Sequence, residues 1–238
     1  MSLKSRGEWN LPKKKKINDI LEYILKSREI KNSEHFLSPS LDDIPDSSSL
    51  FDSMSAAKLI IESVNKGKKI VIHGDFDSDG ICATSLLWDF LYRELSEFLE
   101  KKVDVIPYIP NRIEQGYGLT EDSLKDVLEL GGELLISVDC GVRDEKLINK
   151  YKKKNLSVII TDHHQPPEDL SPELSYPLVH QMYPNHEYPF TQICGTAVVF
   201  LLIQEIRKQV GMNYSISPDS KGLDLVALAT VTDLMPLT

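Results

Sequence analysis

Three short apolar segments of this sequence each run into Asp and His residues. KIVI is followed by HGDFDSDG at 73–80, ELLIS by VDCG at 138–141, and LSVII by TDHH at 161–164. A fourth candidate is Asp233, in ATVTDLMPL. Carboxylates with a few imidazoles and no thiolate suit Mn²⁺ or Mg²⁺ better than a structural zinc ion. The motifs therefore indicate a site for divalent cations.

Crowded carboxylates repel one another unless cations lie among them. Two divalent ions about 3.5–4 Å apart are a common arrangement for phosphoester hydrolysis, because they polarise the phosphorus oxygens and activate a water molecule. No protein nucleophile is then needed, and no GxSxG-like motif occurs in the sequence. Each motif alone could be a helix cap or a polar turn. Their occurrence in order, each at the end of an apolar segment, favours the metal site.

The apolar segments alternate with helical patterns, which predicts strands joined by helical crossovers. Strands are expected at 69–73, 102–109, 133–139, 156–162 and 176–181, and helices at 83–99, 121–130, 144–154, 193–209 and 223–230. This order predicts an α/β fold with a parallel β-sheet of about five strands and helices on both faces. Ligands of such sheets bind outside the carboxyl ends of the strands, so the three motifs should meet at one crevice.

The first part of the chain has a different character. Residues 17–30 have an amphipathic helical pattern, 36–52 are rich in Pro, Ser and Asp and suggest a loop, and 53–65 suggest a helix that ends near Gly67. We therefore expect residues 1–66 to form a helical N-terminal extension that packs on the core. Residues 67–238 would form the catalytic domain.

Composition narrows the class of protein. No apolar run reaches the roughly 18 residues of a membrane span, and the N-terminus lacks the apolar core of a secretory signal, so a soluble cytoplasmic protein without a membrane partner is expected. The three cysteines are far apart, which suggests buried reduced thiols. The net charge of −9 does not exclude a polyanionic substrate, because bound metal ions would cancel part of it. The basic runs at 13–16 and 152–154 are most simply solvated surface.

The four motifs, taken in order, resemble those of the DHH phosphoesterases. Three longer stretches, 54–87, YIPNRIEQGYGL at 108–119 and 188–202, resemble in particular the family's exonucleases specific for single-stranded DNA, and the similarity extends from about Trp9 onward. The resemblance implies a phosphodiesterase with two Mn²⁺ or Mg²⁺ ions that degrades single-stranded DNA in the 5′-to-3′ direction during DNA repair and recombination. Repair proteins such as a helicase or a single-strand-binding protein would be its partners.

The resemblance also implies roles for individual residues. The ligands of one ion would be His73 and Asp77, those of the other Asp79, His163 and Asp233, and Asp139 would bridge the two. Around the ions, His164 would donate to the scissile phosphate, Asp162 would fix an imidazole and Asp75 would be an outer partner. Contacts to the nucleic acid would come from Arg112, Gly195 and Thr196. Arg112 could instead pair with Glu114 or Glu121, and Gly195 and Thr196 could serve only helix packing.

Two other functions are compatible with the motifs. A DHH hydrolase of small substrates, such as cyclic dinucleotides, short oligoribonucleotides or pyrophosphate, would share the metal site but not the stretch at 108–119. A non-catalytic replication scaffold on the same fold would be expected to have lost ligand residues, which are all present here. The family normally continues into a second domain with a GGGH-like motif, and none occurs here. We therefore expect the chain to hold the first catalytic domain.

Overall fold

The computed structural model describes residues 19–186 and 188–237, and these fall into two compact units. The smaller unit ends at Asp43, and the larger spans Ile44–Leu237. Helix α3 (Ser53–Asn65), which the sequence analysis assigned to the N-terminal extension, belongs to the larger unit. That the residues before Ile44 pack on the catalytic domain stays a prediction.

The smaller unit contains two short helices with side-chain caps. Helix α1 (Ile20–Ser27) follows Asp19, whose carboxylate accepts the N–H of Glu22. Helix α2 (Ser33–Leu37) begins after Asn32, which caps it in the same way. The predicted helix at 17–30 is thus shorter, and Ile17 and the basic run at 13–16 lie outside the described residues. The stretch predicted as a loop contains the end of α2 and two 3₁₀ turns, η1 (Leu41–Asp43) and η2 (Ser47–Ser49).

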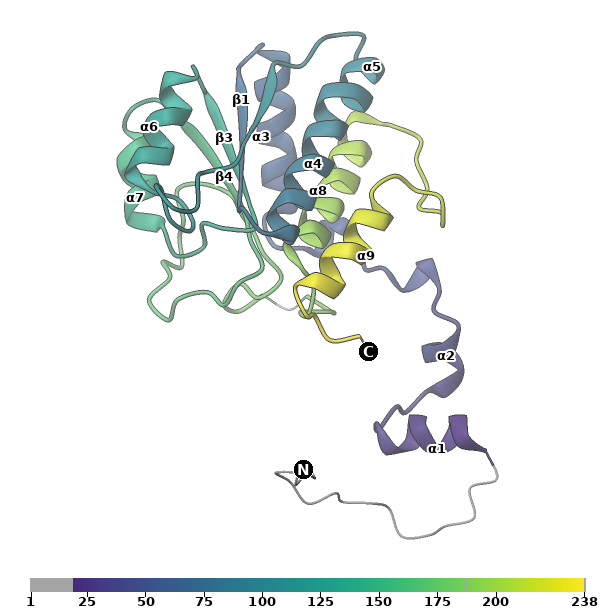
Figure 1. Ribbon diagram of the computed structural model, residues 1–238. Helices are drawn as coiled ribbons and strands as arrows, with labels where there is room; N and C mark the ends of the chain where they lie inside the picture. The colour runs from purple at the N-terminus through teal and green to yellow at the C-terminus, as the bar shows by residue number, and fades with distance from the viewer. Residues whose placement is uncertain (1–18, 187, 238) are drawn as a thin grey trace, which may run out of the picture. The chain divides into compact units, whose positions relative to one another are not determined.

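The larger unit is built on the predicted parallel sheet of five strands, so the α/β fold class is confirmed (Figure 1). The strands are β1 (Ile70–Gly74), β2 (Val105–Tyr108), β3 (Leu134–Val138), β4 (Ser157–Thr161) and β5 (Leu178–Val179), in the order β2-β1-β3-β4-β5. Strand β5 is shorter than predicted. It lies at the sheet edge directly after Pro177, which has no N–H to donate to a ladder.

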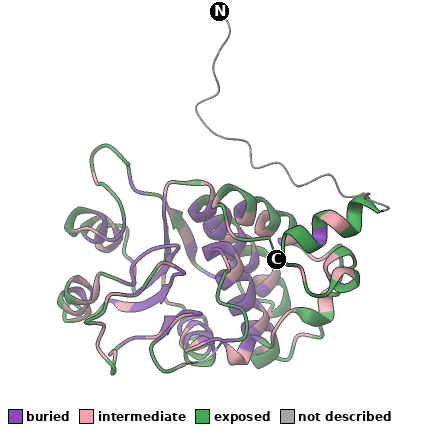
Figure 2. Ribbon diagram, turned by 90° about the horizontal axis from the view of Figure 1, so that it is seen from below, coloured by how far each residue is buried: buried purple, intermediate pink, exposed green. Residues whose placement is uncertain are grey.

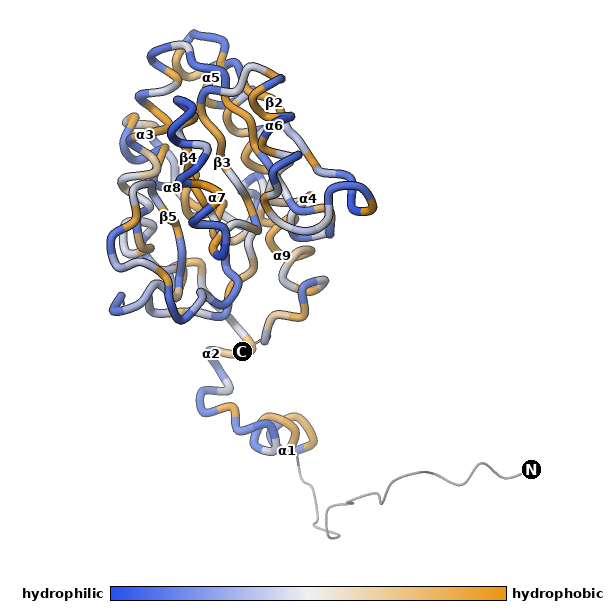
Figure 3. The backbone as a smooth tube through the Cα atoms, turned by 90° about the vertical axis from the view of Figure 1, so that its left-hand side faces the viewer, coloured by the Kyte–Doolittle hydropathy of each residue, from blue (hydrophilic) through white to orange (hydrophobic). Residues whose placement is uncertain are grey.

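Both faces of the sheet are covered by helices, which explains why its strands are almost continuously apolar. Along β1, Ile70 and Ile72 pack with α3, α4 (Ser78–Asp89) and α8 (Gly195–Val210), whereas Val71 packs on the other face. That second face is covered by α6 (Glu121–Glu129) and α7 (Glu145–Lys152). In Figure 2 the buried residues are concentrated in the interior of the larger unit, and in Figure 3 the strands are largely hydrophobic.

The helix after β1 begins earlier than predicted. Asp77 caps α4, because its carboxylate accepts the N–H of Gly80 at 3.0 Å, so the DSDG segment is already the first helical turn. The helix continues through a π-helical segment, Phe90–Leu95, into α5 (Ser96–Phe98). Helix α9 (Leu223–Thr232) packs on α4 and α8. Among the described helices, none combines the length and the apolar composition of a membrane span.

The strand order creates a topological switch point between β1 and β3. From β1 the chain crosses to β2 on one side, and from β3 it crosses to β4 on the other. Connections that leave in opposite directions open a crevice at the carboxyl ends of the two central strands, where α/β proteins bind ligands. The first motif begins in the last two residues of β1, and the second begins in the last residue of β3. The fold therefore places both motifs on the two sides of this crevice.

Candidate metal centre

The structure gathers seven acidic and histidine residues into three overlapping clusters at this crevice. Within each cluster the potential ligand atoms lie within 4.8 Å of one another. The clusters are Asp75, Asp77 and Asp139; Asp139, His163 and His164; and Asp79, His163 and Asp233. Because Asp139 and His163 each belong to two clusters, the three form one continuous site. We name this site the metal centre.

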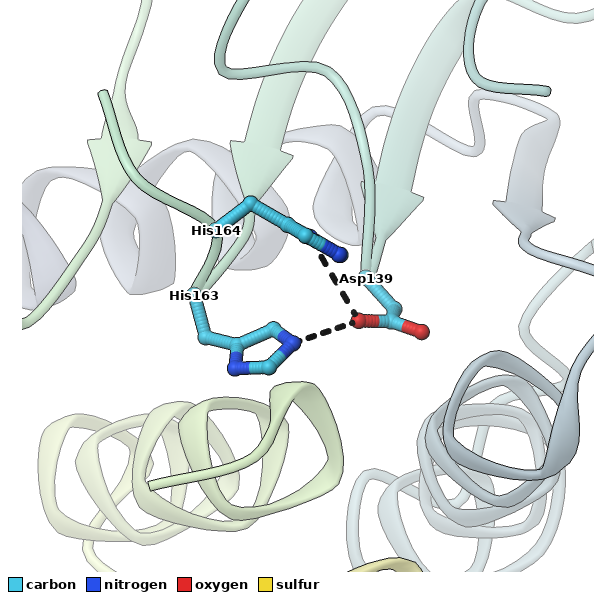
Figure 4. Close-up of side chains that lie close together, drawn as sticks. All are labelled: Asp139, His163 and His164. Atoms are coloured by element: carbon cyan, nitrogen blue, oxygen red, sulfur yellow. Dashed lines mark ion pairs between the residues drawn. The ribbon is translucent and has the colours of Figure 1, made fainter. Parts of the chain in front are cut away.

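His163, which follows β4, lies in the middle of the metal centre. Its Nε2 atom is 3.2 Å from Asp139 Oδ1, 3.5 Å from Asp233 Oδ2 and 3.7 Å from Asp79 Oδ2. Its Nδ1 atom is 3.0 Å from the carbonyl oxygen of Ile193. An Nδ1–H that donates to this carbonyl leaves the Nε2 lone pair facing three carboxylates. Figure 4 shows His163 and His164 on the same side of Asp139.

Several buried polar atoms of this site have no hydrogen-bond partner within the described residues. They include both carboxylate oxygens of Asp139, Nε2 of His163 and Oδ2 of Asp233. An unpaired buried polar atom typically costs about 1–3 kcal/mol, and each one in a native structure requires an explanation. Divalent cations among these atoms would satisfy them and cancel the repulsion of the carboxylates. The residues present therefore fit a site for divalent metal ions.

Burial dominates the electrostatics of the carboxylates. It raises the pKa of Asp139 to about 10, and the negative charges of Asp79 and Asp77 act in the same direction. Burial also raises the pKa of Asp75. It lowers the pKa of His73 to about 4, so this imidazole is neutral at physiological pH. Without cations Asp139 therefore keeps its proton, and metal binding would have to release it.

Asp162 and His164 form a fixed pair beside the metal centre. The Nδ1 atom of His164 is 2.8 Å from Asp162 Oδ1, and the backbone N–H of Val142 donates to Asp162 Oδ2. Burial alone would raise the pKa of Asp162, but the hydrogen bond to His164 and its charge outweigh burial and lower it. The same hydrogen bond raises the pKa of His164. Because the His164 side chain is 39% exposed, it can also reach a bound substrate.

Four of the predicted site residues, His73, Asp75, Gly195 and Thr196, have neighbours other than those that the resemblance implies. His73 is fully buried with its Nε2 unpaired, but it is not in any of the three clusters, and Asp75 is the residue grouped with Asp77 and Asp139. Gly195 and Thr196 are buried, and both donate hydrogen bonds to the carboxylate of Asp79. These contacts favour helix packing over contact with nucleic acid for the two residues.

The mouth of the site carries an aromatic group that sequence reasoning missed. The guanidinium of Arg112 lies 4.8 Å from the ring centre of Phe76, and the Phe76 ring meets Tyr117 edge to face. The hydroxyl of Tyr117 lies 3.1 Å from His164 Nε2. In the described part of the chain Arg112 has no ion pair, and Glu121 pairs with Lys150. The glycines on both sides of Tyr117, each with positive φ, were the sequence signal for an exposed aromatic residue in a turn.

A cavity of about 390 Å³ adjoins this group on the side of His164. Its lining residues include Tyr117, Arg143, Asp144 and His164. The cavity and the metal centre therefore share the imidazole of His164, so a ligand could occupy both at once.

The family model described as "DHH family, N-terminal domain" matches residues 69–230. This chain belongs to the DHH family. The matched range contains the whole metal centre except Asp233. The DHH motifs thus coincide with the residues that the fold brings together.

Curated relatives include two bacterial proteins named single-stranded-DNA-specific exonuclease RecJ. The protein from Bacillus subtilis (strain 168) is 36% identical over 182 residues, which are 76% of this chain and 21% of the relative. The protein from Haemophilus influenzae is 33% identical over 223 residues, which are 92% of this chain and 37% of the relative. The chain thus spans well under half the length of these DHH relatives.

Solved structures of RecJ are similar as well. A RecJ exonuclease bound to manganese is 33% identical with a TM-score of 0.63, covering 79% of this chain and 44% of that one. RecJ from Thermus thermophilus in complex with Mn²⁺ is 28% identical with a TM-score of 0.67, covering 91% of this chain and 28% of that one. Both likenesses agree with the DHH fold of the larger unit.

Proposed function

We propose that this chain is the first catalytic domain of a metal-dependent exonuclease that degrades single-stranded DNA in the 5′-to-3′ direction. One observation carries the proposal: carboxylates and imidazoles from the four motifs meet at the switch point of the sheet, and buried atoms of Asp139, His163 and Asp233 have no hydrogen-bond partner among the described residues. The similarity to proteins named single-stranded-DNA-specific exonuclease supports this substrate. DNA repair and recombination in the cytoplasm, with a helicase or a single-strand-binding protein as partner, is the setting that we propose.

The clusters suggest how the residues would hold two ions, Mn²⁺ or Mg²⁺. Asp139 belongs to two clusters and would bridge the ions. On one side it is joined by Asp75 and Asp77, and on the other by His163, Asp79 and Asp233. His73 would join the first group through its unpaired Nε2. When bound, two such ions polarise the phosphorus oxygens and activate the attacking water.

The remaining residues would bind and orient the substrate. His164, held by Asp162, would donate a hydrogen bond from Nε2 to the scissile phosphate. The hydroxyl of Tyr117 now lies 3.1 Å from that nitrogen, so the Tyr117 side chain would have to move away or accept the same hydrogen together with the phosphate. Arg112 is exposed and lies over the Phe76 ring, so its guanidinium can pair with a phosphate of the substrate. The cavity beside His164 would receive part of the terminal nucleotide.

The test is hydrolysis of a 3′-labelled single-stranded DNA oligonucleotide with Mn²⁺. We expect a ladder of progressively shorter labelled products, and no ladder for Asp139→Ala. The matched control is Asp122→Ala, an exposed carboxylate of α6 outside the three clusters, which should behave like the wild type. Immediate release of the label as a mononucleotide would contradict the polarity. Asp139-dependent cleavage of dinucleotides alone would point to the small-substrate hydrolases.

A further inference from the structure

The four-residue segment at the start of helix α8, Ile193 to Thr196, contacts three members of the metal centre through Ile193, Gly195 and Thr196. We name this segment the α8 start. It lies about 30 residues after His163 in the chain and more than 110 after Asp79. None of its side chains offers a charged group, so it cannot bind cations through a carboxylate or an imidazole. Its contacts with the metal centre therefore need another explanation.

The first contact fixes the imidazole of His163. The Nδ1 atom of His163 is 3.0 Å from the carbonyl oxygen of Ile193. A carbonyl can only accept, so the proton of the neutral ring must lie on Nδ1. Nε2 is then free to coordinate, and it faces Asp79, Asp139 and Asp233. A carbonyl behind a metal-binding histidine commonly selects its tautomer in this way.

The second contact holds the carboxylate of Asp79 with three donors. Its Oδ2 accepts the N–H of Gly195 at 2.6 Å, and its Oδ1 accepts the N–H and the hydroxyl of Thr196 at 2.7 and 2.6 Å. The same hydroxyl lies farther, at 3.0 Å, from the backbone carbonyl oxygen of Asp79. Cys194, the residue before α8, provides no side-chain cap. Asp79, from helix α4, therefore caps α8 across the tertiary interface, and its negative charge lies at the positive end of the helix dipole.

The third contact is a close approach to Asp139. A Cβ atom added to Gly195 would lie 2.7 Å from Asp139 Oδ1 and 2.9 Å from Asp139 Cβ. Contacts under 3.0 Å force a displacement, and here the displaced group would be the carboxylate shared by two clusters. Only a glycine lets the helix end lie this close to Asp139.

We infer that the α8 start is the positioning element of the metal centre, and that Thr196 is its main positioning side chain. Thr196 is fully buried and orients the Asp79 carboxylate, and it does not touch the substrate. This inference rests on the proposed function, because it presumes divalent ions at Asp79, His163 and Asp139. It assigns Gly195 and Thr196 to the geometry of the metal site and not to the path of the nucleic acid.

If Thr196 positions Asp79, removing its hydroxyl should weaken the binding of divalent metal ions. Thr196→Val keeps the shape of the side chain but removes one of three donors to Asp79. The carboxylate can then rotate away from the orientation in which its Oδ2 faces His163 Nε2, the orientation that would hold an ion. Loss of such a supporting hydrogen bond commonly weakens metal binding by about 10–100-fold. Thr196→Ser retains the hydroxyl and should restore affinity to within about threefold of the wild type.

The test measures the Mn²⁺ dissociation constant by isothermal titration calorimetry. The matched control is Thr84→Val, which removes a buried threonine hydroxyl of α4 that bonds only a backbone carbonyl. We expect weakening by about tenfold or more for Thr196→Val, rescue by Thr196→Ser, and no change for Thr84→Val. Equal affinities of Thr196→Val and the wild type would overturn the inference. A defect of the same size in Thr196→Ser would also overturn it.

Two further variants keep the outcomes distinct. Gly195→Ala leaves all three donors to Asp79 in place, but its added Cβ atom would displace the Asp139 carboxylate. It should therefore also weaken Mn²⁺ binding about tenfold or more. If Thr196→Val does not fold, the Mn²⁺ affinity of Gly195→Ala tests the inference in its place. Unchanged affinity in Gly195→Ala would count against the inference. If the wild type does not bind Mn²⁺, or if Asp139→Asn binds Mn²⁺ as tightly as the wild type, the proposed function itself is contradicted, independently of the α8 start.

Discussion

Asp139 contributes both carboxylate oxygens to the interior of the metal centre, and neither has a partner within the described residues. Its backbone has a φ of +63°, in the left-handed region that Asp and Asn tolerate better than most residues. The turn is supported by the Ser137 hydroxyl, which donates to the carbonyl of Cys140. Backbone strain and unpaired oxygens at one residue are costs that metal binding would offset.

The metal-free protein should therefore lose stability as the pH rises. In the folded state the pKa of Asp139 is raised to about 10, whereas an unfolded chain ionises near 4. Between these values the folded state holds a proton that the unfolded state has lost, so the free energy of unfolding falls with increasing pH. Asp139→Asn cannot ionise. In EDTA its melting temperature should exceed that of the wild type by about 10 °C or more near pH 8, and by only about 3–5 °C near pH 5, because the cost in the wild type grows by about 1.4 kcal/mol per pH unit. Parallel pH profiles of the two proteins would contradict this prediction.

Arg112 is expected to act on substrate binding alone. Its guanidinium is exposed and lies over Phe76, outside the three metal clusters. Arg112→Ala should raise KM for single-stranded DNA about tenfold with little change in kcat, because a phosphate contact formed in the ground state is lost. Steady-state kinetics checks this, with Arg93→Ala as the control, an exposed arginine that pairs with Asp89. A fall in kcat at constant KM would show that Arg112 acts in the chemical step.

For individual residues, the sequence predicted which side chains meet at the metal centre but not all of the contacts between them. Asp139 and His163 follow parallel strands, so their meeting at one edge of the sheet could be foreseen. The bonds of Thr196 to Asp79 could not, because they depend on how α8 docks against α4, over a separation of 117 residues. The grouping of Asp75 with Asp77 was missed for a similar reason, since the bend after β1 decides which side chains point inward.

At the scale of elements, the central strand β3 shows how the sheet is stabilised. Leu135 and Ile136 are adjacent and both fully buried, but they pack in different cores on opposite faces. Leu135→Ala and Ile136→Ala should each lower the free energy of unfolding by about 2–5 kcal/mol. Leu130→Ala, at a position 41% exposed, should cost less than about 1 kcal/mol. Urea denaturation measures all three, and a small effect for either buried residue would mean that one face is not tightly covered.

The strands were predictable because burial on both faces makes them almost continuously apolar. Helix α3 was predicted with the bounds that it has, since its apolar stripe is regular and Gly67 follows its end with a φ of +70°. Helix α2 was missed because its five residues are mostly polar and none is buried. It depends on the side-chain cap of Asn32, a local signal that a search for apolar periodicity does not detect.

At the scale of the whole molecule, the net charge of −9 makes divalent cations important for stability as well as for chemistry. A ligand that binds only the folded state stabilises it by about 2.7 kcal/mol at a concentration 100 times its Kd. For a chain of this size that corresponds to a rise of roughly 5–10 °C in melting temperature. We expect EDTA to lower the melting temperature by this amount and excess Mn²⁺ to restore it. An equal rise in Asp139→Asn would place the stabilising ion elsewhere.

The most direct test of the metal centre is to count the bound ions by equilibrium dialysis against Mn²⁺. The account predicts about two Mn²⁺ per chain for the wild type, because Asp139 joins clusters on both sides of the crevice. Asp139→Asn should bind at most about one ion, since both clusters lose a shared carboxylate. A wild-type chain that binds no Mn²⁺, or a variant that binds as many ions as the wild type, would contradict the account.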